Sequence, residues 1–180
     1  MTIIMCVAVI YFGEYIRALE GYGYLGAFVI SIFGGATIII PVPMLAVVFA
    51  LGGVMKYTWL VGISASIGET IGALTIYMTG HGAGAAINTR INNGNPGRLQ
   101  SIYIKVMDFV KRRGGLAIFL VSSVVNPFFY PTALTAGATG FGVKKFIPIC
   151  FAGKTIKAMT VSYAGYYGLK GLFQWLGITI

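Results

Sequence analysis

Three charged side chains stand inside long apolar runs of this chain, and they are the residues that could do chemistry: Glu69, Lys154 and Lys157. A charge in the middle of a membrane-embedded helix costs about 3 kcal/mol on insertion scales unless it is paired or hydrated. One hypothesis is that these charges line a polar cavity and meet a lipid headgroup or a proton. The other is that they neutralise one another as an ion pair. The two are compatible, because a substrate phosphate can open a pair at a cavity wall.

Glu69 and Lys154 occupy matching positions in two similar runs, residues 68–80 and 153–165. Gly, Thr, Ile, Ala, Thr and Gly recur in them at a constant offset, which indicates two copies of one unit. If a two-fold axis relates the copies, the two opposite charges face each other. Lys157 matches a glycine and has no evident partner, so it is favoured for contact with an anionic headgroup.

The composition excludes a soluble domain. Of 180 residues, 57% are hydrophobic and only 9% are charged, and the mean hydropathy is +0.86. These values are typical of an integral membrane protein. The net charge of +9 would favour nucleic acid as the partner of a soluble protein. Here membrane lipids with anionic headgroups are the expected partners, nucleic acid is not, and a homo-oligomer stays open.

Proline-containing breaks interrupt two apolar stretches, residues 25–54 and residues 114–140. A straight helix cannot continue through these breaks, because each proline removes a backbone donor and restricts the residue before it. Backbone groups freed at membrane depth must be buried in protein or line a watery cavity. Each stretch is therefore predicted to form a re-entrant hairpin, broken at Pro41, Pro43, Pro127 and Pro131.

A predicted crossing helix follows each hairpin, at residues 57–80 and 146–165. An odd number of crossings between the copies turns the second copy upside down. The expected fold is therefore an all-α membrane protein built as an inverted repeat of two re-entrant hairpins, each followed by a transmembrane helix. Its single membrane domain divides into an N-terminal helix (1–22), repeat 1 (23–80), a loop with an amphipathic helix (81–113), repeat 2 (114–168) and a C-terminal segment (169–180).

Two boundaries of this scheme depend on local composition. Gly-Tyr-Gly-Tyr at residues 21–24 predicts a break after the N-terminal helix. Residues 81–113 contain six Lys and Arg against one Asp, which predicts a cytoplasmic segment, and residues 99–113 have the pattern of a helix lying on the membrane. The expected location is a membrane, with residues 81–113 on its cytoplasmic side.

The remaining polar residues favour structural roles. Four of them surround the second break and are expected mainly to satisfy freed backbone groups, with ligand contact less favoured: Asn126, Tyr130, Thr132 and Thr135. His81 is predicted to be an interface residue, and Cys6 and Cys150 to be packing residues. No metal-ligand cluster and no nucleophile with a base stands out, so neither an enzyme nor a cofactor is expected.

Several runs, in this order, resemble the DedA family, also called the VTT-domain or SNARE-associated Golgi protein superfamily. The resemblance covers roughly residues 23–168, and its last two runs are most similar to a small YqaA-like prokaryotic branch. The runs are Pro41-Val42-Pro43, Gly52-Gly53, Gly68-Glu69-Thr70-Ile71-Gly72, Gly114-Gly115, Asn126-Pro127-Phe128-Phe129 and Gly153-Lys154-Thr155-Ile156-Lys157.

The resemblance implies two opposed re-entrant hairpins and the movement of lipids between leaflets. It matches Glu69 with an acidic residue that is common in the family. The family's second acidic residue, which follows the Pro-x-Pro break, is missing, since Met44 and Leu45 occupy that place. The two arginines of the family's second hairpin are replaced by Val124 and Tyr130. These departures question proton coupling and phosphate recognition by arginine, and Lys154 and Lys157 are candidates for the cationic role.

The expected function is a scramblase or flippase for a phospholipid or a polyprenyl-phosphate carrier. Its candidate transport residues are Glu69, Lys154, Lys157, Asn126 and Tyr130. The alternatives are an ion- or proton-coupled transporter of a small solute, and a membrane assembly factor that transports nothing.

Overall fold

The described part of the chain is all-helical, as the composition predicts. The computed structural model describes residues 20–36, 44–92, 112–126 and 128–175. Within these residues the helices are α3 (Glu20–Ala36), α4 (Met44–Val54), α5 (Thr58–Asn92), α7 (Gly115–Ser123), α8 (Phe129–Ala138) and α9 (Val143–Trp175).

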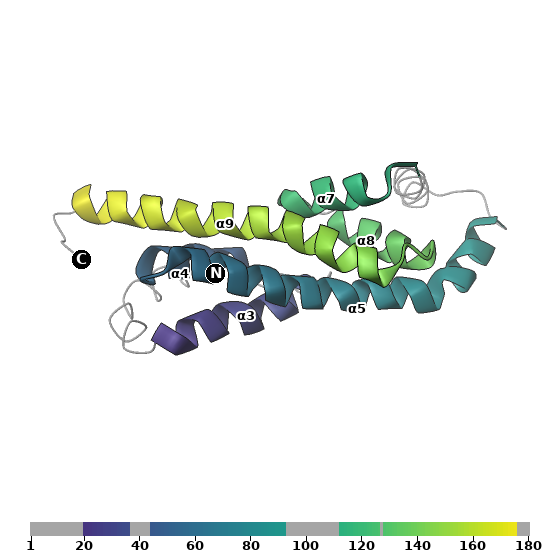
Figure 1. Cartoon of the computed structure of the whole chain (residues 1–180), viewed down its shortest axis with the longest axis horizontal. Helices are drawn as coiled ribbons and strands as arrows, with labels where there is room; N and C mark the ends of the chain where they lie inside the picture. Colours follow the sequence, from purple (N-terminus) through teal and green to yellow (C-terminus); the bar gives the residue numbers. More distant parts are fainter. Residues whose placement is uncertain (1–19, 37–43, 93–111, 127, 176–180) are drawn as a thin grey trace.

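Helices α5 and α9 form the long axis of the molecule and run antiparallel beside each other (Figure 1). Among the described residues, the stretch Thr58–Gly82 of α5 is the one long and apolar enough to cross a membrane. Helix α9 has 33 residues but does not meet the same criterion, since lysines in its middle lower its hydropathy. The predicted crossing at residues 146–165 therefore stays a prediction.

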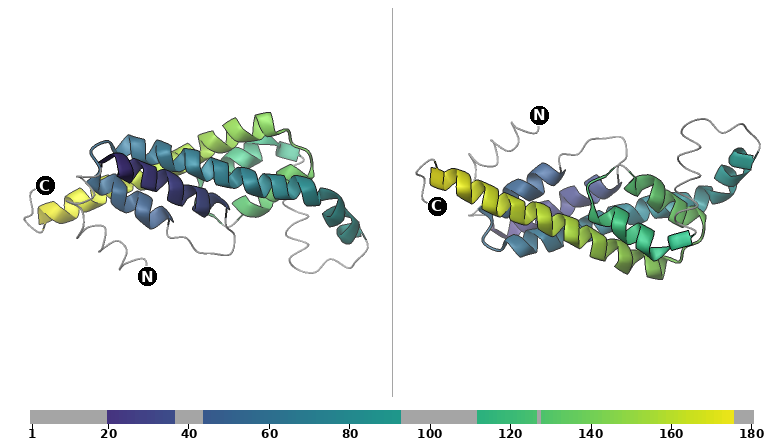
Figure 2. Two further views of the ribbon diagram at one scale, coloured as in Figure 1. Left: turned by 90° about the horizontal axis from the view of Figure 1, so that it is seen from below. Right: turned by 90° about the horizontal axis from the view of Figure 1, so that it is seen from above.

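The four shorter helices form two pairs, one before each long helix. Helix α3 packs on α5 and α7 packs on α9, so each of these helices lies on the long helix of its own half. Helices α4 and α8 do the opposite, because α4 packs on α9 and α8 packs on α5. Figure 2 shows the result, in which the first pair lies toward one end of the molecule and the second pair toward the other. Each half thus contributes one short helix that packs on the long helix of the other half.

Glycines bring the crossed helices into close contact, and they do so in matching pairs. A Cβ atom at Gly52 would collide with the carbonyl of Ser162, and one at Gly137 with the carbonyl of Tyr77. The two contacts are related by an offset of 85 residues, which is also the separation of Glu69 and Lys154. Gly137 lies 85 residues after Gly52, and Tyr77 lies 85 residues before Ser162. The same offset relates the contact of Gly80 with the carbonyl of Leu134 to that of Gly165 with the carbonyl of Phe49. Glycine at these positions lets the backbones approach.

Three boundaries differ from the sequence expectations. The Gly-Tyr-Gly-Tyr segment does not break the chain, because α3 runs through it and Gly23 lies against the side chain of Met55. Helix α5 continues beyond Gly80 to Asn92, and α9 extends the predicted span to Val143–Trp175. The hydrophobic pattern marks where a helix is apolar, whereas backbone hydrogen bonding continues past it into polar sequence.

The second break is shorter than predicted. Helix α7 ends at Ser123 and α8 begins at Phe129, so Pro131 lies in the first turn of α8. Backbone N–H groups in a first turn have no intrahelical acceptor, and proline is tolerated there. The other predicted breakers, Pro41, Pro43 and Pro127, lie outside the described residues, as do residues 1–19, most of the predicted amphipathic helix, and residues 176–180.

The buried apolar residues form two clusters along the long axis. One contains Val61 and Ala65 of α5 and Ala158 of α9, and the other contains Ala73 of α5 and Cys150 of α9. Glu69 lies between Ala65 and Ala73 on the same helix face, because each is four residues away. Lys154 lies likewise between Cys150 and Ala158. The charges therefore meet where the two cores adjoin.

Candidate functional site

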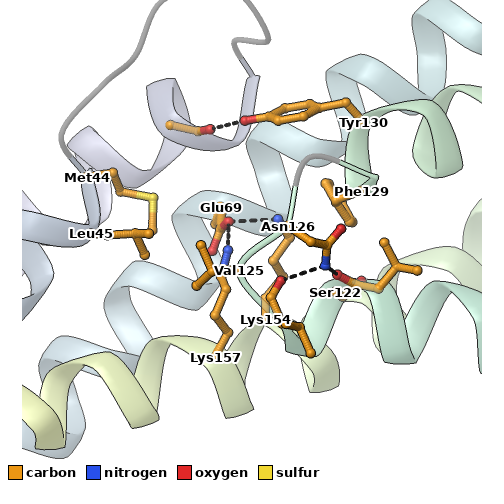
Figure 3. Close-up of a pocket in the computed structure, with 13 residues that line it drawn as sticks. Met44, Leu45, Glu69, Ser122, Val125, Asn126, Phe129, Tyr130, Lys154 and Lys157 are labelled. Atoms are coloured by element: carbon orange, nitrogen blue, oxygen red, sulfur yellow. Dashed lines mark hydrogen bonds and ion pairs between the residues drawn. The ribbon is translucent and has the colours of Figure 1, made fainter. Parts of the chain in front are cut away.

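Glu69 of α5 and Lys154 of α9 form a buried ion pair. Lys154 Nζ donates to Glu69 Oε1 at 2.7 Å, and the two side chains are 3% and 5% exposed. The pairing that was weighed from the repeated runs is therefore present, and Figure 3 shows both side chains pointing toward each other. The attraction within such a pair offsets part of the desolvation cost of burying a carboxylate and an ammonium group.

Lys157 also donates to Glu69 Oε1, so the expectation that it lacks a partner is wrong. It lies one turn after Lys154 on α9 and its side chain is 11% exposed. Two ammonium groups thus share one carboxylate oxygen. The other oxygen, Glu69 Oε2, is buried and has no hydrogen-bond partner among the described residues.

Phe129, the first residue of α8, completes the surroundings of Lys154. Its ring centroid lies 3.5 Å from Lys154 Nζ, within the range of a cation–π contact. Sequence reasoning missed this residue as part of the site. In the repeat, Phe129 matches Met44, the first residue of α4, by the same offset that relates Lys154 to Glu69. Its position between two predicted breakers, Pro127 and Pro131, was the available signal.

Asn126 holds the turn between α7 and α8. Its side-chain amide donates to the carbonyls of Val121 and Val124, each at 2.9 Å, and its Oδ1 accepts from the N–H of Phe128 at 2.9 Å. These bonds satisfy carbonyls at the end of α7 and an N–H at the start of α8. The favoured role, satisfaction of freed backbone groups, is confirmed for Asn126.

Tyr130 joins the two halves across the site. Its hydroxyl donates to the carbonyl of Gly34 at 2.9 Å, in the last turn of α3 (Figure 3). Carbonyls in a last turn lack an intrahelical donor, so Tyr130 caps α3 from α8. Tyr130 therefore satisfies a backbone carbonyl of the first half, and not one at the second break, where its role was expected.

Other predicted polar residues lie around the site rather than in it. Thr132 donates to the carbonyl of Phe128 at 2.7 Å, and Thr135 is buried with no partner for its hydroxyl among the described residues. His81 is exposed, stacks on Tyr77 and approaches the carbonyl of Gly137 at 3.3 Å. Cys150 packs in a core, and Cys6 lies outside the described residues. No group of metal-ligating side chains occurs in the described part of the chain.

A cavity of about 310 Å³ opens between the two pairs of short helices and contains the charged cluster. Its lining combines the buried charged residues Glu69, Lys154 and Lys157 with apolar residues, of which Val124 and Val125 are 60% and 59% exposed. The remaining lining residues are Gly34, Met44, Leu45, Val121, Ser122, Asn126, Phe129 and Tyr130. The five candidate transport residues named from sequence all line this cavity.

In the described part of the chain, fold and site define an all-helical protein with one helix apolar enough to cross a membrane and a buried charge cluster where the two halves meet. The model of a protein family described as the VTT domain matches residues 40–167. This chain belongs to the VTT-domain, or DedA, family. Comparison with curated proteins and with solved structures finds no match. Family membership and the long apolar helix together indicate a membrane protein, in a family that is generally of transporter type.

Proposed function

We propose that this protein moves lipids between the leaflets of a membrane, with the headgroup passing through the cavity around Glu69 while the acyl chains stay in the bilayer. The observation that carries the proposal is the cavity itself, which places Lys154 and Lys157 inside and the exposed Val124 and Val125 at its edge. Buried charged residues beside exposed apolar ones fit an amphiphile better than a fully polar solute.

In this proposal the pairs α3–α4 and α7–α8 are re-entrant hairpins of an inverted repeat. The matching glycine contacts support a two-fold relation between the halves. The starts of the helices support it too, because α4 and α5 begin at Met44 and Thr58, and the same offset leads to the starts of α8 and α9 at Phe129 and Val143. Hairpins that enter from opposite sides would bring their tips to the middle of the bilayer.

The cations of the proposed pathway come from α9 and not from the hairpin. Met44 and Leu45, which stand where the resemblance expects an acid, line the cavity, and so do Val124 and Tyr130, which stand where it expects arginines. Lys154 and Lys157 supply the only positive charges among the cavity's described lining residues. The runs that contain them are the basis for proposing a YqaA-like branch.

The distribution of exposed charge supports one orientation. Among the residues whose exposure the structure describes, Arg112, Arg113, Lys144 and Lys145 are exposed near the starts of α7 and α9, and Lys56 alone is exposed beside the start of α5. By the positive-inside rule, the end with more cations is cytoplasmic. We therefore propose a prokaryotic plasma-membrane protein with segment 81–113 in the cytoplasm.

The test is lipid movement by purified protein in liposomes. Phospholipids labelled on an acyl chain with a dithionite-sensitive fluorophore are incorporated in both leaflets, and dithionite is added outside. Protein-free liposomes should lose about half of the signal, since only the outer leaflet is accessible, and proteoliposomes should lose nearly all of it. Equal loss in both samples for several headgroups would remove lipid movement as the function. Gradient-driven uptake of a small solute would instead favour a solute transporter, and inactivity in both assays an assembly factor.

A further inference from the structure

The charged cluster has a net charge of one positive unit, because its two ammonium groups share one carboxylate. Glu69 supplies one negative charge, and Lys154 and Lys157 supply two positive ones. All three are buried or nearly so, and Glu69 Oε2 has no partner within the described residues. An uncompensated charge is costly in an apolar interior, so the cluster favours a bound anion in the adjoining cavity.

The two lysines are not equivalent. Lys154 is held on two sides, by Glu69 and by the Phe129 ring, and is 3% exposed. Lys157 is more exposed, and Glu69 is its only hydrogen-bond partner in the described part of the chain. Lys157 can therefore leave Glu69 at lower cost, because Lys154 still neutralises the carboxylate.

The space beside Lys157 results from a difference between the two halves. Gly68 faces the Phe28 carbonyl and Ser31 of α3, and Gly153 faces the Phe119 carbonyl and Ser122 of α7. By these contacts, Ser31 and Ser122 occupy equivalent places on the two long helices. Beyond them, α3 continues for another turn to Ala36, whereas α7 ends at Ser123.

In the first half, Gly72 packs against that extra turn, and a Cβ there would meet the carbonyl of Ile32. In the second half the turn is absent, and the position that matches Gly72 is Lys157. Its side chain lines the cavity together with Val124 and Val125, which follow the end of α7.

We infer that Lys157 is the residue that selects the headgroup: it exchanges Glu69 for the phosphate oxygen of a lipid with one net negative charge, while Lys154 stays on Glu69. This inference rests on the proposed function and adds a substrate class to it. A zwitterionic headgroup brings its own cation next to Lys157 and leaves the excess charge uncompensated. The protein should therefore move anionic phospholipids faster than zwitterionic ones.

The experiment compares acyl-labelled phosphatidylglycerol with phosphatidylcholine of the same chains, each as a trace probe in phosphatidylcholine liposomes. Potassium buffer on both sides with valinomycin removes any potential created by moving charge. The wild-type protein should move the glycerol lipid about tenfold faster, the factor expected from one charge-assisted hydrogen bond.

Variants on α9 assign this preference to one residue. Lys157→Gln should reduce the ratio of the two rates to near one, mainly through loss of the glycerol-lipid rate. Lys157→Arg should retain the preference. Lys145→Gln, which removes an exposed lysine from the same helix, is the matched charge control and should retain it as well. Size-exclusion chromatography establishes that each variant is folded.

The outcomes separate this inference from the function on which it rests. If wild-type protein moves neither lipid, the proposed function itself fails. If it moves both at equal rates, or if Lys157→Gln keeps the preference, lipid movement stands and selection by Lys157 is wrong. The wild-type comparison needs no variant, so a misfolded Lys157→Gln leaves the inference testable. Protein-dependent entry of free glycerol 3-phosphate into the liposomes would assign the anion site to a soluble phosphate instead, and would also overturn the inference.

Discussion

At the scale of residues, one carboxylate organises the centre of the protein. Glu69 Oε1 accepts from both Lys154 and Lys157, so removing Glu69 leaves two buried cations, whereas removing either lysine leaves a neutral pair. The charge that remains, and not the number of bonds lost, should decide the stability of each variant.

We therefore expect Glu69→Gln to be the most destabilising substitution in the cluster, by about 3 to 5 kcal/mol. Lys154→Met should cost less, and Lys157→Met should be nearly neutral, because each restores charge balance. Thermal unfolding of the purified variants in one detergent measures the order. A Lys157→Met variant as unstable as Glu69→Gln would contradict this account.

Tyr130 provides a second test at this scale. Tyr130→Phe removes only the hydroxyl that donates to the Gly34 carbonyl, and it should destabilise the protein by about 1 kcal/mol. Tyr163→Phe is the matched control, since that ring is 39% exposed on α9. The unfolding temperatures of the two variants are compared, and equal values would show that the Tyr130 hydroxyl does not hold α3 to α8.

At the scale of elements, the structure depends on close approach between crossed helices. Helix α8 lies so near α5 that a Cβ at Gly80 would meet the Leu134 carbonyl, whereas a Cβ at Gly82, half a turn further, would meet nothing within 4 Å. Two glycines on one helix thus have opposite packing roles.

Gly80→Ala should force α5 and α8 apart and destabilise the protein by about 1 to 3 kcal/mol, the usual cost of overpacking. Gly82→Ala should be neutral or stabilising by up to about 1 kcal/mol, because alanine favours helix more than glycine does. Unfolding temperatures again give the comparison. Equal effects of the two substitutions would show that the α5–α8 contact is looser than described.

At the scale of the whole molecule, the two halves begin at opposite ends. Helices α3 and α5 begin at one end, and α7 and α9 begin at the other (Figure 1). If both short pairs are re-entrant, the entry and the exit of each pair lie on the same side of the membrane, and the two pairs lie on opposite sides.

Single cysteines at exposed positions test this topology in a background without Cys6 and Cys150. We expect Tyr22→Cys and Lys56→Cys to react with an impermeant maleimide from outside intact cells. Arg113→Cys and Lys144→Cys should react only after the membrane is opened. A difference in sidedness between Tyr22 and Lys56 would show that the first pair crosses the membrane.

The sequence alone determined the membrane character and predicted a repeated unit with charged residues at its centre, because hydropathy, proline breaks and a constant offset are local properties of the chain. It could not determine that Lys157 shares Glu69 with Lys154, since that depends on how α5 and α9 are placed side by side. Nor could it show that α7 ends a turn early and leaves room beside Lys157, because a helix end depends on its packing as well as on its residues. The charges were visible in the sequence, but their sum within one cavity was decided by tertiary packing.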